Sequence, residues 1–135
     1  MEEAEYIKII ELYESHLQVK KLNSPGTVRL YLHSVNIFIR YCEKFKQNLV
    51  LPEQWEIADV GLRELEAFLK YQIDIKHWKR STLVTCISGV KSFLDYLTET
   101  HYISSNPIQH FKLPRDISKI GKQRFDVKQI NKLFH

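Results

Sequence analysis

The sequence predicts an all-α domain built as a four-helix bundle. Apolar residues recur every three or four positions in four separate segments, the spacing that places them on one face of a helix. Hydrophobic residues make up 44% and charged residues 27% of the 135 residues, and Gly and Pro number only four each, a composition typical of a helix-rich globule. A chain of this length can bury a core without disulfides or metal ions.

The first helix is expected over residues 4–20. Its predicted core-facing residues, at three- and four-residue spacing, are Ile7, Ile10, Tyr13 and Leu17. Residues 1–14 hold five glutamates against one lysine. The positive end of the helix dipole favours acidic side chains in the first turn. The side of this helix opposite the apolar stripe is expected to be polar.

The second helix has the clearest start in the sequence and is expected to end near Phe45. Ser24 is the expected N-cap, and Pro25 the first helical residue. Two stripes follow along this helix. The stripe predicted to face the core contains Val28, Tyr31, Val35, Phe38 and Cys42. The stripe predicted to face outward contains Arg29, His33, Asn36 and Arg40.

A loop and a third helix are expected next. Residues 47–56 contain Pro52 and lack a helical period, which predicts a loop in which Trp55 and Ile57 cover the core. Asp59 is the expected N-cap of a helix over about residues 60–75. Its predicted inward residues are Leu62, Leu65, Phe68 and Leu69, and its predicted outward residues are Glu64, Glu66 and Lys70.

The fourth helix is expected to begin at Arg80 or Ser81 and to end near Thr98. Its predicted inward stripe contains Leu83, Ile87, Val90, Leu94 and Leu97, widened by Cys86 and Phe93. Gly89 lies within this helix, where glycine costs about 1 kcal/mol relative to alanine. We therefore expect either a close helix contact or a close approach to a ligand at Gly89.

Three regions are predicted along the chain. Residues 1–110 form the helical domain, which the Asn106-Pro107 pair ends because a residue before proline is disfavoured in the helical conformation. Residues 111–124 are basic and aperiodic, as expected of an interdomain linker. Asp126 caps a new amphipathic run within residues 125–135, which we interpret as the start of a further domain that is cut off there.

Positive charge is concentrated in alternate segments. The formal net charge is +4 and the isoelectric point is about 9.0. Residues 20–46 hold six Lys and Arg against one Glu, and residues 70–91 hold five against one Asp. Between them, residues 53–66 hold five acidic residues against one Arg. This distribution favours two basic helices that share one face toward a polyanionic partner.

No constellation for catalysis stands out. The six histidines are scattered without metal-ligand spacing, and Cys42 and Cys86 lie singly among apolar residues, as buried thiols do. There is no P-loop or dinucleotide fingerprint, so we expect no cofactor, no metal and no enzyme activity in this chain itself. No apolar run reaches the roughly 18 residues of a membrane span or resembles a signal peptide, which predicts a cytoplasmic protein without a membrane partner.

Four motifs resemble the tyrosine recombinases of the phage-integrase type. The segment Ser24-Pro25-Gly26-Thr27-Val28, with Tyr31, Val35, Phe38 and Ile39 after it, resembles the opening helix of their core-binding domain. The segment Ser81-Thr82-Leu83, with residues 87–93 and 96–97, is similar to the last helix of that bundle. Residues 102–107 resemble its stop before the linker, and residues 125–134 resemble the first helix of the catalytic domain.

This resemblance implies a SAM-like core-binding domain that forms half of a C-shaped clamp on duplex DNA. The second and fourth helices would lie against adjacent major grooves. The family's catalytic residues would lie beyond His135, so none of the seven tyrosines here is a candidate nucleophile. The parent protein would cut and rejoin DNA at specific sites through a 3′-phosphotyrosyl intermediate. It would assemble with other recombinase protomers on DNA, whereas this chain alone is expected to be a monomer.

The basic stripes and the resemblance together select candidate DNA contacts. Arg and Lys are expected to neutralise phosphates, and Ser and Thr to donate to phosphate at a helix N-terminus. On the second helix the candidates are Thr27, Arg29, His33, Asn36 and Arg40. Around the fourth helix they are Lys79, Arg80, Ser81, Thr82, Thr85 and Lys91. Family members often carry Asn or Arg where this chain has Val84, Thr85 and Cys86, so recognition is expected to use phosphate contacts and DNA shape.

Two alternatives stay open. The chain could be a helical protein-interaction module whose acidic first helix docks a partner. It could also be a regulatory DNA-binding protein without a catalytic half. Salt-dependent binding of duplex DNA would exclude the first, and a gene that continues past His135 with the recombinase tyrosine would exclude the second.

Overall fold

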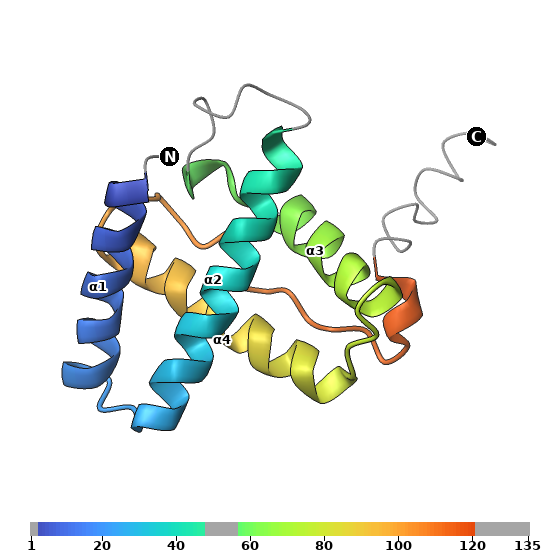
Figure 1. The fold of residues 1–135 in the computed structure, drawn as a ribbon, viewed down its shortest axis with the longest axis horizontal. Helices are drawn as coiled ribbons and strands as arrows, with labels where there is room; N and C mark the ends of the chain where they lie inside the picture. Colours follow the sequence, from blue (N-terminus) through green and yellow to red (C-terminus); the bar gives the residue numbers. More distant parts are fainter. Residues whose placement is uncertain (1–2, 48–56, 121–135) are drawn as a thin grey trace.

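A computed structural model describes residues 3–47 and 57–120, and these residues form an all-helical domain (Figure 1). The four α-helices are α1 (Glu3–Val19), α2 (Pro25–Gln47), α3 (Leu62–Asp74) and α4 (Arg80–Glu99). Two single 3-10 turns, η2 (Ile57–Asp59) and η3 (Ile117–Lys119), complete the order of elements. Within the described ranges there is no strand, and the predicted all-α class with four helices is confirmed. The expected position of Trp55 and the expected helix after Asp126 lie outside these ranges.

The long helix α2 lies at the centre of the domain, with α1 on one side, α3 on the other and α4 crossing it (Figure 1). The crossing of α2 and α4 is close because Gly89 has no side chain. A Cβ atom at Gly89 would lie 3.1 Å from the Ser34 Cβ and 3.2 Å from the Tyr31 Cα. The close helix contact that the sequence allowed at Gly89 is thus confirmed.

A single hydrophobic cluster joins the four helices. The predicted inward stripes of α2 and α4 are confirmed, with Tyr31 partly buried and the other members buried. Aromatic rings connect the helices edge to face, Phe38 with Phe68 at 5.2 Å and Tyr13 with Phe93 at 5.1 Å between centroids. Neither cysteine forms a disulfide, both are buried as predicted, and burial raises the pKa of Cys86 to about 11.

The predicted core face of α1 was wrong in its first half. The structure buries Tyr6, Ile9, Tyr13 and Leu17, whereas Ile7 is 47% exposed and Ile10 is only partly buried. Both sets of residues are compatible with helical spacing from Tyr13. Tyr6 distinguishes the two sets, because its hydroxyl donates to Asn36 of α2, whereas Tyr13, which donates to Ser92 of α4, is common to both.

The start of α3 also differs from the prediction. Asp59 belongs to η2, and the N-cap of α3 is Gly61, so the predicted cap was wrong. The Gly61 amide donates to the Glu64 carboxylate at 3.0 Å, which satisfies one of the free amides at the helix start. Glu64 is therefore 7% exposed instead of facing outward.

The chain turns back on the bundle after α4. The Asn106 side chain donates to the Lys91 carbonyl at 3.2 Å and to Asp95 at 2.8 Å, and it accepts from the Ile108 amide at 3.0 Å. The segment expected to be a linker is described as far as Ile120, which is buried. This part packs against the helices, and the domain boundary at residue 110 stays a prediction.

Candidate nucleic-acid interface

The two helices predicted to contact DNA begin at the same edge of the domain. From their crossing, the N-terminal halves of α2 and α4 diverge toward the lower edge of Figure 1. We call residues 20–29 and 79–82 at this edge the helix-start edge. Each helix start carries a partial positive charge from its aligned peptide dipoles, so both dipoles favour an anion on this side of the domain.

At the start of α2, Ser24 acts as the predicted N-cap. Its hydroxyl oxygen accepts from the Thr27 amide at 3.2 Å, and its proton is donated to the Thr27 hydroxyl at 3.0 Å. Arg29, one turn further on, is exposed. Among the residues that the structure describes, none pairs with its guanidinium, which is therefore available to an external anion.

At the start of α4, the N-cap is Lys79, whose side chain forms no capping hydrogen bond. Ser81 and Thr82 follow in the first turn with exposed side chains, and no described residue hydrogen-bonds to their hydroxyls. The Thr85 hydroxyl donates to the Ser81 carbonyl at 3.1 Å. The first turn of α4 therefore offers backbone amides, two hydroxyls and a lysine to solvent.

Arg80 and Lys91 hold the chain that follows the bundle. The Arg80 guanidinium donates to the Pro114 carbonyl at 2.6 Å and to the carbonyls of Leu113 and Arg115 at 3.3 Å. The Lys91 ammonium donates to the Phe111 carbonyl at 2.6 Å. Both cations thus donate hydrogen bonds to backbone carbonyls of residues 111–115, which belong to no α-helix.

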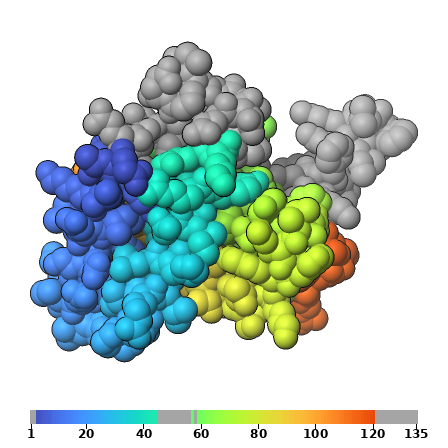
Figure 2. All heavy atoms as spheres, viewed as in Figure 1, coloured from blue at the N-terminus to red at the C-terminus, as the bar shows by residue number. Residues whose placement is uncertain are grey.

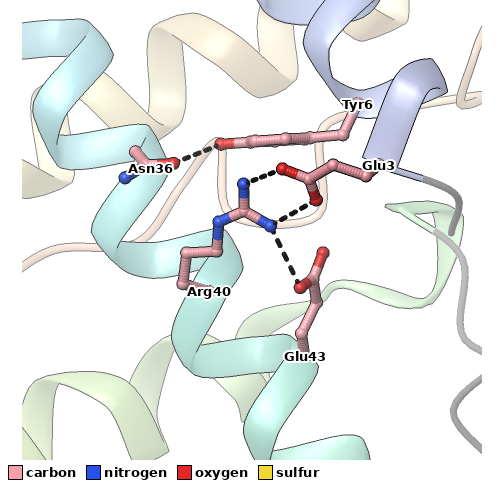
Figure 3. Close-up of polar contacts among 5 residues, drawn as sticks. All are labelled: Glu3, Tyr6, Asn36, Arg40 and Glu43. Atoms are coloured by element: carbon pink, nitrogen blue, oxygen red, sulfur yellow. Dashed lines mark hydrogen bonds and ion pairs between the residues drawn. The ribbon is translucent and has the colours of Figure 1, made fainter.

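Arg40 joins α1 to α2 (Figure 3). Its guanidinium lies 2.6 and 2.8 Å from the two carboxylate oxygens of Glu3 and 3.3 Å from Glu43. The same group stacks over the Tyr6 ring at 4.7 Å, and the Tyr6 hydroxyl donates to Asn36 at 3.1 Å. The Arg40 side chain is 38% exposed, and two carboxylates already compensate its charge.

This ion pair predicts a pH-dependent difference in stability. The hydrogen bonds from Arg40 hold the pKa of Glu3 below its ordinary value, and the pair raises the pKa of Arg40. A lowered carboxylate pKa in the folded state stabilises the protein above the ordinary Glu pKa and stops doing so as pH falls through the folded value. Arg40→Leu should therefore lose stability at neutral pH, by a margin that shrinks toward pH 3 in urea titrations.

Arg29→Leu is the matched control, since Arg29 is an exposed arginine on the same helix. Its difference from the natural protein should stay constant between neutral and acidic pH. A margin for Arg40→Leu that is equally constant would show that the Glu3–Arg40 pair is not formed in solution.

The structure thus divides the eleven candidate residues into two groups. Five have exposed side chains that bond to no described residue: Arg29, His33, Lys79, Ser81 and Thr82. Six bond within the domain: Thr27, Asn36, Arg40, Arg80, Thr85 and Lys91. Four of the five free residues lie at the helix-start edge, and His33 lies one turn beyond Arg29.

Sequence reasoning missed Lys20 and Lys21. Both lie exposed in the turn between α1 and α2, at the helix-start edge. The signal that could have identified them is a pair of lysines placed just before the N-cap Ser24, since residues before a helix start lie at the positive end of its dipole.

Over the described ranges, no three His, Cys, Asp or Glu side chains gather as a metal site would require. The helices described there are also too short or too polar to cross a membrane.

The comparison with known families gives the class of this domain. The family described as phage integrase, N-terminal SAM-like domain, matches residues 9–104. The match covers all of α2, α3 and α4 and most of α1. The chain belongs to this family, as the motifs in its second and fourth helices predicted.

Curated relatives are tyrosine recombinases. The chain is 23% identical over 130 residues to tyrosine recombinase XerC of Pediococcus pentosaceus, covering 95% of this chain and 40% of that protein. It is 30% identical over 117 residues to XerC of Chlorobaculum parvum, covering 84% of this chain and 33% of the relative. A tyrosine recombinase of Thermosipho africanus is 28% identical, with 84% and 38% covered. The chain spans at most about two fifths of the length of these relatives. No solved structure matches it significantly.

Proposed function

We propose that this domain grips duplex DNA for a site-specific tyrosine recombinase, whose cutting and rejoining chemistry resides in a separate catalytic domain. The observation that carries the proposal is the common helix-start edge of α2 and α4, where two positive dipole ends meet free cationic side chains. Membership of the integrase N-terminal family supports it. The domain itself would position DNA and supply no reacting group.

Phosphate contacts are the main proposed interaction. Arg29 and Lys79, together with Lys20 and Lys21 in the turn before α2, would neutralise backbone phosphates. Ser81 and Thr82 would donate hydroxyl protons to a phosphate held at the start of α4, and His33 would extend the contact along α2. Arg40, Arg80 and Lys91 would reach DNA only after giving up hydrogen bonds that their cationic groups donate inside the domain. We therefore propose that Arg40, Arg80 and Lys91 hold the interface in shape.

Duplex binding should be strongly salt-dependent. Four cations that release counterions from phosphates predict an affinity loss of about 100-fold between about 50 and 200 mM salt. Fluorescence anisotropy with a labelled duplex measures this directly. Absence of binding to any duplex at about 50 mM salt would sink the proposal and favour the protein-interaction alternative.

Assembly with other protomers on DNA is the second part of the proposal. The chain alone is proposed to be monomeric, since contacts between protomers would form around the DNA. Sedimentation with and without duplex tests this. A stable dimer in the absence of DNA would contradict it. A recombination assay with the complete gene product tests the other alternative, because a regulatory protein without a catalytic half would bind DNA but not recombine it.

A further inference from the structure

A cavity of about 640 Å³ opens between α2 and α3. These two helices lie side by side on the face seen in Figure 2. Small-molecule sites are typically clefts of roughly 300 to 1,000 Å³, so the cavity has the size of a ligand site. Its lining combines one buried amide, three aromatic rings and exposed lysines, and each of these groups constrains the ligand.

The buried amide belongs to Gln72, which is 4% exposed and lines the cavity. Its backbone carbonyl accepts from the Trp78 amide at 2.9 Å. No residue in the described part of the chain hydrogen-bonds to its side-chain amide. A buried amide without partners costs about 1 to 3 kcal/mol, and native proteins retain few of them. A ligand that both accepts and donates a hydrogen bond in the cavity would satisfy it.

Three aromatic side chains form the walls. Tyr41 and Tyr71 lie with their ring centroids 5.6 Å apart, and Trp78 stands edge-on to the buried Phe68 at 6.0 Å. Tyr71 is 38% exposed, and Tyr41 and Trp78 are partly buried, so parts of these side chains remain accessible from the cavity. Aromatic faces stack on planar heterocycles, with about 1 to 3 kcal/mol per nucleobase.

The charge around the cavity favours an anionic ligand. Lys44 on α2 and Lys76 after α3 line it with exposed side chains. In the described ranges neither forms an ion pair. Arg40 also lines the cavity, but Glu3 and Glu43 already bind its guanidinium. A phosphate is therefore expected near Lys44 and Lys76.

We propose that this cavity binds an adenine nucleotide. The Gln72 amide would pair with N6 and N7 of the base, the geometry by which glutamine recognises adenine. The base would stack on the aromatic walls, and the phosphate would lie between Lys44 and Lys76. The nucleotide could be free or displaced from a DNA strand, and both present the same chemistry. An acidic peptide would pair with the lysines and its backbone would satisfy the amide, but that backbone carries no planar heterocycle to stack on the aromatic walls.

Calorimetric titration of the chain with AMP, CMP and inorganic phosphate tests this site. AMP is expected to bind more tightly than CMP, and phosphate alone more weakly than either. Gln72→Leu should weaken AMP binding by about tenfold without lowering the melting temperature, because the variant loses an unpaired buried amide. The Lys44→Ala/Lys76→Ala variant should weaken AMP and CMP alike. The Lys8→Ala/Lys112→Ala variant, which removes two exposed lysines outside both the cavity and the helix-start edge, should bind AMP as the natural chain does.

An adenine-containing single strand and the same strand in a blunt duplex distinguish the two sources. If the single strand binds more tightly than AMP and its binding depends on Gln72 in the same way, the site is assigned to a displaced base. If AMP binds more tightly, the site is assigned to a free nucleotide. If Gln72→Leu changes neither, the proposal is wrong. Binding of the blunt duplex should not depend on Gln72, so loss of this site and loss of the helix-start edge are separable.

Discussion

Replacing Phe38 with alanine is expected to destabilise the domain by about 3 to 5 kcal/mol. Phe38 is 1% exposed and packs edge to face on Phe68 of α3, so the truncation opens a void between the central helix and α3. Small domains have a total stability of about 5 to 15 kcal/mol, so this variant should be close to unfolding at room temperature. Urea titration followed by circular dichroism gives the difference.

Leu30→Ala is the control on the same helix, because Leu30 is 53% exposed. A change at an exposed position is expected to stay within about 0.5 kcal/mol. Similar costs for the two variants would mean that α2 does not present its Phe38 face to the core, and the assignment of its outward stripe would fall with it.

Changing both Arg29 and Lys79 to alanine is expected to weaken duplex binding by about 100-fold at low salt. Each side chain is exposed, and each lost charged contact removes roughly 1.5 kcal/mol. The slope of log affinity against log salt should become shallower by about one unit per lost phosphate contact. The melting temperature should change little because neither side chain bonds to a described residue.

The matched control replaces Lys8 and Arg63, two exposed cations on α1 and α3. It changes the net charge by the same amount away from the helix-start edge. If the control weakens binding as much as Arg29→Ala/Lys79→Ala, the domain attracts DNA only through its net charge. If the edge variant binds like the natural chain, α2 and α4 do not face DNA.

The amino-acid sequence by itself determined the helices and the faces of α2 and α4. Ser24 and Pro25 specify the start of α2 through contacts within one turn. Periodicity alone identified the apolar stripe that ends at Cys42, although it did not include Ile39, which is buried beside it. The basic segments could also be identified from runs of neighbouring residues. Family motifs in α2 and α4 could be recognised because such motifs are runs of neighbouring residues.

Only the tertiary structure decided which polar side chains are free. Arg29 and Arg40 occupy one predicted stripe, yet Arg40 meets Glu3, 37 residues earlier in the chain. Arg80 likewise meets a carbonyl 34 residues later. The core face of α1 and the burial of Gln72 depend in the same way on which helix packs beside them. Helical spacing fixes the direction of a side chain around its own axis, whereas its partners depend on long-range packing, which no local pattern encodes.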